Sequence, residues 1–140
     1  KYVVLGLISE GGMGAVYRAL QLPVEREVAF KVLRTELKDS NNGRDRFIRE
    51  ARAVSRLNHA NIITLYDFGF DQGRHPYMVM EYAEGGDMEE LIKSRNGKPF
   101  PEEMVVDWLI QMCLSLKHIH DRKILHRDMK SANIFLYRDM

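Results

Sequence analysis

The spacing of apolar residues changes along this chain, and the change divides the chain into two parts. Up to Tyr82, apolar residues fall in short runs rich in β-branched and aromatic side chains, as is typical of strands. After Gly85 and Gly86 they recur every three or four positions, as in helices. We therefore expect an α+β fold with a mostly β part, residues 1–84, and a mostly α part, residues 85–140.

Five strands are predicted in the first part, separated by the glycine pair at 11–12, by Pro23 and by the turn-like residues 71–75. The strand segments are 2–8, 15–21, 26–34, 63–70 and 76–82. One amphipathic helix, residues 44–57 with a start at 41–43, interrupts them. Its apolar residues are Phe47, Ala51, Val54 and Leu57. The pattern predicts a five-stranded antiparallel sheet with one helix.

Two helices are predicted in the second part. Asp87 can cap a short helix that ends near Ser94, and residues 96–101 form a loop. Residues 102–120 then form a long core helix. Its expected apolar face consists of Val105, Leu109, Met112, Leu116 and Ile119. Cys113 lies among apolar residues of the same helix, so we expect it to be a small core filler.

Composition excludes several kinds of protein. With 45% apolar and 29% charged residues the chain is globular, and 21 basic against 20 acidic residues give no charge excess for nucleic acid or anionic membranes. No apolar run approaches the roughly 18 residues of a membrane span, and no signal-peptide pattern begins the chain, so we expect a cytoplasmic protein. Four of the five histidines are expected to be unclustered, on the surface or in helix packing, without a metal. They are His59, His75, His118 and His120.

The segment 126–135, HRDMKSANIF, combines an Asp and an Asn five positions apart with a Lys between them. A hydroxyl nucleophile needs a carboxylate to accept its proton, while an oxygen ligand holds magnesium on a triphosphate. Asp128 and Asn133 are the candidates, and Lys130 could neutralise charge on the transferred phosphoryl group. The alternative, a charged surface turn, is disfavoured because five placed residues precede a strand-like run.

A glycine-rich stretch, SEGGMGAV at residues 9–16, lies between two predicted strands. Glycines at these positions let the backbone of a hairpin approach phosphates closely, and the backbone N–H groups can then bind the phosphate anion. A plain hairpin turn is the alternative. A dinucleotide-binding turn should lead into a helix, whereas a strand follows here, so a Rossmann oxidoreductase is disfavoured.

Lys31 ends an alternating strand run, VAFK, and Glu50 has helical spacing to the apolar residues on either side of it. A carboxylate on that apolar face would be costly without a cation, so we predict an ion pair between Lys31 and Glu50. Two alternatives stay open. Lys31 could be a solvated strand residue, and Glu50 could pair with Arg46 or Arg49 on its own helix.

Taken in order, SEGGMGAV, VAFK, Glu50, MEYAEGGD and HRDMKSAN resemble the eukaryotic-type protein kinase family across essentially the whole chain. The first half is similar to bacterial Ser/Thr kinases, and residues 109–136 are similar to NIMA-related kinases. The form of the last motif, with Lys130, is similar to Ser/Thr kinases. The resemblance implies a small lobe made of a five-stranded sheet and a helix, followed by the first helices and the catalytic loop of a large lobe.

The resemblance also implies roles for single residues. ATP phosphates would be bound by the loop glycines and by Lys31 paired with Glu50, and the adenosine by a set of hinge and sheet residues. The loop glycines are Gly11, Gly12 and Gly14, and the adenosine set is Val16, Ala29, Met80, Glu81, Ala83, Asp87 and Phe135. Asp128 would be the catalytic base, Lys130 a second catalytic residue and Asn133 a Mg²⁺ ligand. The implied cofactors are ATP and Mg²⁺, and the implied partner is a protein substrate with Ser or Thr.

Two further roles follow from the resemblance. Val54, Leu65 and His126 are similar to members of the apolar stack of active kinases. Arg127 would read a phosphate on an activation loop.

Two departures from the family pattern matter. Ser9 stands where the first loop glycine usually lies, which is expected to stiffen the loop. The family has an Asp-Phe-Gly and an Ala-Pro-Glu motif after the catalytic loop, and neither motif occurs after this loop in the rest of the 140 residues. The resemblance therefore implies a fragment that is inactive, or nearly so, by itself. The alternative is a pseudokinase or a nucleotide-binding interaction module.

Overall fold

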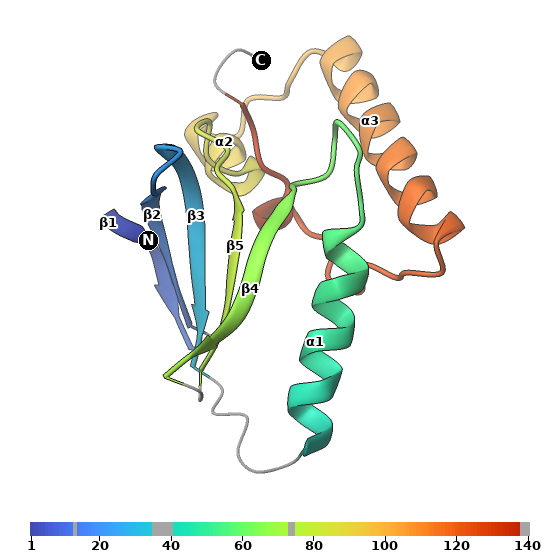
Figure 1. Cartoon of the computed structure of the whole chain (residues 1–140). Coiled ribbons are helices and arrows are strands. Elements are labelled where there is room, and N and C mark those ends of the chain that lie inside the picture. The colour runs from blue at the N-terminus through green and yellow to red at the C-terminus, as the bar shows by residue number, and fades with distance from the viewer. Residues whose placement is uncertain (13, 35–40, 73–74, 138–140) are drawn as a thin grey trace. The chain divides into compact units, whose positions relative to one another are not determined.

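The computed structural model describes residues 1–12, 14–34, 41–72 and 75–137, which divide into two compact units (Figure 1). The first unit consists of residues 1–58 and 63–82, and the second of residues 59–62 and those from 83 onward. None of the helices in the described ranges is both long enough and apolar enough to cross a membrane.

The first unit contains a five-stranded antiparallel sheet with the strand order β1-β2-β3-β5-β4. The strands are β1 (Tyr2–Gly11), β2 (Gly14–Gln21), β3 (Arg26–Leu33), β4 (Leu65–Asp71) and β5 (His75–Glu81). The predicted sheet is confirmed. Part of the predicted turn at 71–75, Gly73 and Arg74, lies outside the described residues.

The register of the sheet gathers one set of side chains on a common face. Val16 on β2 is opposite Lys31 on β3, and Lys31 is opposite Met78 on β5. Ala29 is opposite Met80 in the same ladder. Because paired residues and residues two apart in a strand point to the same side, these five side chains share one face.

The other face of the sheet forms the core of the first unit. Ala19, Val28 and Val79 are fully buried there, and partly buried aromatic side chains pack around them. The ring of Phe30 stacks on that of Tyr77 at 5.1 Å. Burial of β-branched and aromatic side chains on one face is typical of strands in a half-buried sheet.

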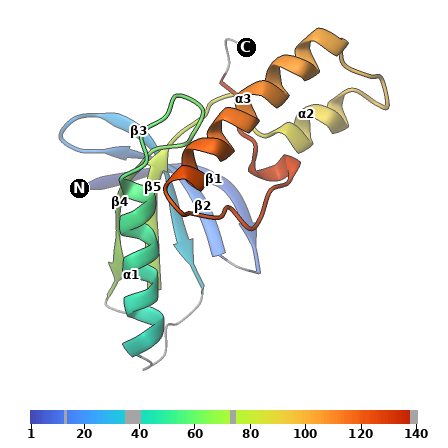
Figure 2. The ribbon, with the colours of Figure 1, turned by 90° about the vertical axis from the view of Figure 1, so that its right-hand side faces the viewer.

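The helix α1 (Asn41–Ser55) lies alongside β4, as Figures 1 and 2 show from two sides. The ring of Phe47 meets those of Phe68 and Phe70 edge-on, at centroid distances of 6.2 and 5.4 Å. Since Phe68 is paired with Met78, α1 packs on the sheet face that carries Lys31. The predicted helix is confirmed.

The second unit contains α2 (Met88–Ser94), α3 (Glu102–Asp121) and a short 3₁₀ helix, η1 (Ser131–Asn133). Asp87 caps α2 as predicted: its Oδ1 accepts a hydrogen bond from the N–H of Glu90 at 2.9 Å. The side chain of Glu90 accepts in return from the N–H of Asp87, which completes a capping box.

The helix α3 departs in part from its predicted role as a core helix. Ile119 is buried, but Leu109, on the predicted apolar face, is 50% exposed, and Cys113 is exposed instead of filling the core. The physical reason is that α3 is apolar on more than one side. Its exposed apolar residues are Met104, Val106, Leu109, Ile110 and Leu114. The described part of the chain covers the side that includes Ile119.

Residues 59–62, between α1 and β4, are bound to α3. The side-chain amide of Asn61 donates to Oε1 of Gln111 at 2.9 Å, and Oγ of Ser115 donates to the Asn61 carbonyl at 3.3 Å. The rings of His59 and His118 lie 5.0 Å apart. The prediction that these four histidines are unclustered is therefore wrong for this pair, because the chain brings together residues that are far apart in sequence.

Candidate active site

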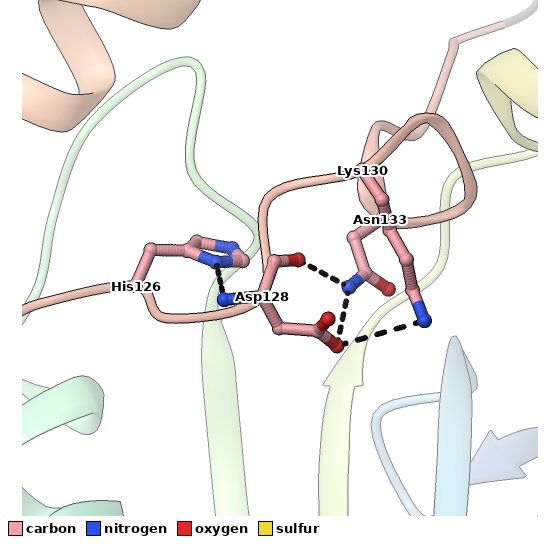
Figure 3. A network of polar contacts seen from close by, with 4 residues as sticks. All are labelled: His126, Asp128, Lys130 and Asn133. Atoms are coloured by element: carbon pink, nitrogen blue, oxygen red, sulfur yellow. Dashed lines mark hydrogen bonds and ion pairs between the residues drawn. The ribbon is translucent and has the colours of Figure 1, made fainter.

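The predicted Asp, Lys and Asn of segment 126–135 lie together in the structure (Figure 3). Nδ2 of Asn133 donates to the backbone carbonyl of Asp128 at 2.8 Å and to its carboxylate at 3.0 Å. Nζ of Lys130 lies 3.7 Å from the same carboxylate oxygen, Oδ2. The turn into η1 places Asn133 next to Asp128, so the side chains of Asn133 and Lys130 converge on one carboxylate.

The backbone before η1 also holds Asp128. Its N–H donates to Nδ1 of His126 at 3.2 Å, as Figure 3 shows. Arg127 has a φ of 67°, in the left-handed region that residues other than glycine rarely adopt. The hydrogen bond to His126 and the left-handed conformation of Arg127 were not predicted. Arginine rarely adopts this conformation, so the sequence carries no signal for it.

The polar atoms at this site suit a hydroxyl and a hard cation. The carboxylate of Asp128 is exposed and can accept a proton. Asn133 bonds Asp128 only through its amide nitrogen in these two contacts. Its amide oxygen is a ligand of the type that Mg²⁺ prefers. Among the described residues no group of three or more His, Cys, Asp and Glu gathers to hold a metal. The side-chain oxygens of Asp128 and Asn133 are of the kind that can bind Mg²⁺.

The segment that follows the loop pairs with the one that precedes α2. Gly85 N–H donates to the Leu136 carbonyl at 2.7 Å, and Leu136 N–H donates to the Gly86 carbonyl at 2.9 Å. Asp87 and Phe135 lie opposite each other in an antiparallel bridge. Two residues of the predicted adenosine set are thus adjacent, and the ring of Phe135 is half-exposed.

The glycine-rich stretch forms the end of the β1–β2 hairpin. Gly11 is paired with Gly14, whose φ is 147° and whose hypothetical Cβ would overlap the carbonyl oxygen of Val32. At Gly11 and Gly12 nothing lies within 4 Å of the Cβ position. A glycine is required at position 14 by its positive φ and by the close approach of β3, whereas Gly11 and Gly12 have open space beside the backbone. Since β2 follows, the Rossmann alternative is excluded.

The predicted ion pair between Lys31 and Glu50 is not present. Glu50 is exposed and bonds Nε of Arg46, one turn earlier in α1, at 2.9 Å. Lys31 makes no ion pair with any residue in the described ranges. The expectation that Glu50 lies on the apolar face of α1 was wrong, because Phe47 and Ala51 pack inward and the i, i+4 partner Arg46 is within reach in solvent.

The sheet residues of the predicted adenosine set are partly brought together. Val16, Ala29 and Met80 share the sheet face described above. The N–H of Glu81 donates to the Thr64 carbonyl at 2.9 Å, and its carboxylate accepts from the Thr64 N–H at 3.2 Å. The N–H of Glu81 is therefore bonded to Thr64, the residue that precedes β4, and not directed at a ligand.

The predicted apolar stack of Val54, Leu65 and His126 stays a prediction. Leu65 is buried at the start of β4, while Val54 and His126 are exposed in the structure. Ala83 is half-buried two residues beyond Glu81.

The chain matches the protein kinase domain family over residues 2–140. It is 38% identical over 135 residues to the serine/threonine-protein kinase Nek3 of Mus musculus, covering 96% of this chain and 25% of that protein. It is 42% identical over 136 residues to the serine/threonine-protein kinase pkn3 of Myxococcus xanthus, covering 97% and 24%. With the serine/threonine-protein kinase PrkC of Bacillus subtilis it shares 39% identity over 136 residues, covering 97% and 20%.

The chain thus spans a quarter or less of the length of these three curated relatives. Both predicted resemblances, to NIMA-related and to bacterial Ser/Thr kinases, are confirmed. The match over residues 2–140, together with the sheet and the loop geometry, shows that the chain belongs to the protein kinase domain family.

Proposed function

We propose that this chain supplies the nucleotide-binding residues and the catalytic loop of a Ser/Thr protein kinase. The reaction is transfer of the γ-phosphoryl group of ATP to a Ser or Thr hydroxyl of a protein. The observation that carries the proposal is the convergence of Asn133 and Lys130 on the carboxylate of Asp128. The names of the relatives, all Ser/Thr protein kinases, support the choice of acceptor.

In the first unit, the loop glycines and Lys31 bind the phosphates. The open space at Gly11 and Gly12 admits a phosphate to backbone N–H groups. Lys31 has no competing ion pair among the described residues, so its ammonium group is available as a point charge for phosphate oxygens. Val16, Ala29 and Met80, on the same face, form the apolar surface for adenine.

In the second unit, Asp128 accepts the proton of the attacking hydroxyl as the O–P bond forms and ADP leaves. Asn133 holds the Asp128 carboxylate in place through its amide nitrogen and offers its amide oxygen to Mg²⁺. When bound, Mg²⁺ neutralises charge on the phosphates. Lys130 stabilises the charge on the transferred group. Asp87 and Phe135, which lie opposite each other, are assigned to the ribose and the adenine.

Calorimetric titration of the chain with ATP and Mg²⁺ tests the binding half of this proposal. We expect Lys31→Met to lower ATP affinity about tenfold or more, since a phosphate-binding charge is lost. Lys93→Met, which removes an exposed lysine of α2, is the matched control and should bind as the unchanged chain does. No ATP binding by the unchanged chain would overturn the assignment.

Phosphoryl transfer tests the catalytic half. A protein containing this chain should transfer ³²P from γ-labelled ATP to a Ser/Thr peptide, and Asp128→Asn should abolish transfer while ATP affinity stays within about twofold. Transfer that survives Asp128→Asn would show that Asp128 is not the base.

A second candidate, a nucleotide-binding module without catalysis, is favoured by one observation: Glu50 pairs with Arg46, and Lys31 has no carboxylate partner among the residues that the structure describes. Thermal denaturation separates the two candidates. A kinase should be stabilised more by ATP with Mg²⁺ than by ATP alone, whereas equal stabilisation by both favours the module.

A further inference from the structure

Glu10 and Arg34 form an ion pair that spans three strands of the sheet. Glu10 lies near the end of β1, beside the loop glycines, and Arg34 directly follows β3. Oε1 of Glu10 accepts from a guanidinium nitrogen of Arg34. Since β2 lies between β1 and β3, the pair connects the end of β1 to a strand with which β1 has no ladder.

The pair lies on the face of the sheet opposite to Lys31. Glu10 is paired with Ala15, and Ala15 is paired with Val32, so these residues share a face. Val32 and Lys31 are consecutive in β3 and point to opposite sides. The bond between Glu10 and Arg34 therefore cannot itself contact a phosphate bound at Lys31. The ion pair can therefore affect a ligand bound at Lys31 only through the backbone of the glycine-rich loop.

The end of β1 has few other restraints. The register between β1 and β2 shifts twice, the second time between Leu7 and Ser9, directly before Glu10. Most β1 side chains are exposed, Leu7 at 56% and Ile8 at 46%. On the β2 side, by contrast, Gly14 fits closely against Val32. One side of the hairpin end is thus fixed by packing, and the other by the ion pair.

We propose that Glu10 and Arg34 are a positioning pair that holds the described part of the glycine-rich loop, residues 9–12 and 14, ready to bind ATP phosphates. The inference rests on the proposed function for the ATP site and adds two residues to it. A loop that is already ordered loses less conformational entropy when the ligand binds. The side chains are each 54% exposed, so the pair is screened, and its loss should weaken ATP binding by about two- to fivefold.

Removal of the Glu10 charge distinguishes positioning from a simple effect of charge. Glu10→Gln makes the region more positive, so a field effect alone would strengthen ATP binding. A positioning role predicts the opposite sign. Arg34→Gln should weaken ATP binding by a similar factor, and the double variant Glu10→Gln with Arg34→Gln should be no weaker than either single variant.

The measurement is the Kd of ATP with Mg²⁺ by calorimetry. Glu27→Gln is the matched control, because it breaks the exposed Glu27–Arg18 pair at the other end of β2 and β3. Its ATP affinity should be unchanged. The exchanged variant, Glu10→Arg with Arg34→Glu, should recover affinity to within about twofold of the unchanged chain. Tighter binding by Glu10→Gln, additive losses in the double variant, or no recovery in the exchanged variant would each overturn the proposal.

Hydrogen exchange without nucleotide provides a readout that does not need ATP. The amides of Gly11 and Gly12 should exchange faster in Glu10→Gln and Arg34→Gln than in the unchanged chain or in Glu27→Gln. Equal exchange in all four would show that the pair does not hold the loop. If the unchanged chain binds no ATP, the proposed function fails, while the exchange experiment still decides whether the pair restrains the loop.

Discussion

The hydroxyl of Tyr2, on β1, donates to Oδ2 of Asp67, on β4, at 3.0 Å, although β1 and β4 are the two edge strands of the sheet. The ring of Tyr2 meets that of Phe30 edge-on at 5.3 Å, and Phe30 stacks on Tyr77. A row of aromatic side chains over the buried core thus leads from one edge of the sheet to the other. The bond at its end ties the edges together.

This bond makes the stability of the sheet sensitive to alkaline pH. Burial of the ring, followed by the hydrogen bond to the Asp67 carboxylate, raises the pKa of Tyr2 to about 12 from its ordinary 10.0. The folded state therefore retains a proton that the unfolded chain loses. The stabilisation is complete below about pH 10 and disappears as pH rises through 12. We expect Tyr2→Phe to cost about 1–2 kcal/mol of unfolding free energy at pH 7.

Urea unfolding of the unchanged chain and of Tyr2→Phe at several pH values checks this. The difference in unfolding free energy should be constant from pH 7 to 9 and shrink between pH 10 and 12. A difference that does not depend on pH would mean that the Tyr2 hydroxyl is not held by Asp67.

The glycine-rich hairpin should tolerate a methyl group at one glycine and not at another. Gly14→Ala forces a side chain into a φ of 147° and against the carbonyl of Val32, so it should lower the unfolding free energy by about 2 kcal/mol or more. Gly12→Ala places its methyl group in open space and should change stability by less than about 0.5 kcal/mol. Chemical denaturation without nucleotide measures both. Equal losses would contradict the close approach of Gly14 to β3.

The histidine pair should make the second unit less stable in acid. Burial of the His118 ring, and then the nearby Arg122 and His59, lower the pKa of His118 below its ordinary 6.5. A histidine with a lowered pKa stabilises the fold above the unfolded pKa, and this contribution is lost as pH falls below it. The unchanged chain should therefore lose more stability between pH 7.5 and 5 than His118→Gln does. Thermal unfolding at the two pH values decides, and identical losses would exclude the pair as the source.

The amide of Asn133 should matter to catalysis through Asp128. Asn133→Ala removes both hydrogen bonds to Asp128 and an oxygen ligand for Mg²⁺, and we expect phosphoryl transfer to fall about 10²- to 10⁴-fold. Ser131→Ala, in the same short helix, keeps those bonds and serves as the control. Steady-state kinetics of a protein containing this chain would measure both. A loss below tenfold for Asn133→Ala would show that Asp128 is held by other contacts.

The elements of this fold are readable in the sequence because their signals are local. Alternation gives the strands, helical spacing gives α1 and α3, and Asp87 followed by Glu90 gives the cap of α2. The loop at 126–135 was predicted for the same reason, since Asp128 and Asn133 are five positions apart and one turn brings them together.

The wrong predictions concern which side of a helix is buried and which charged residues form ion pairs. Periodicity placed Glu50 and Leu109 among apolar neighbours, but tertiary packing selected another side of each helix. Arg46 lies one turn from Glu50 and competes with any more distant cation. The contact between His59 and His118 joins residues far apart in sequence, and no local pattern could predict it.

The register of β3 has a consequence for length variation among related sequences. Lys31 lies on the same face of the sheet as Val16 and Met78. Successive residues of a strand point to opposite faces, so the number of residues between the start of β3 and Lys31 decides which face carries the lysine. Deleting one residue between Arg26 and Lys31 would turn Lys31 toward the aromatic core and bring Phe30 to the opposite face. Insertions and deletions in functional relatives should therefore fall in the turn at 22–25, where they leave this count unchanged.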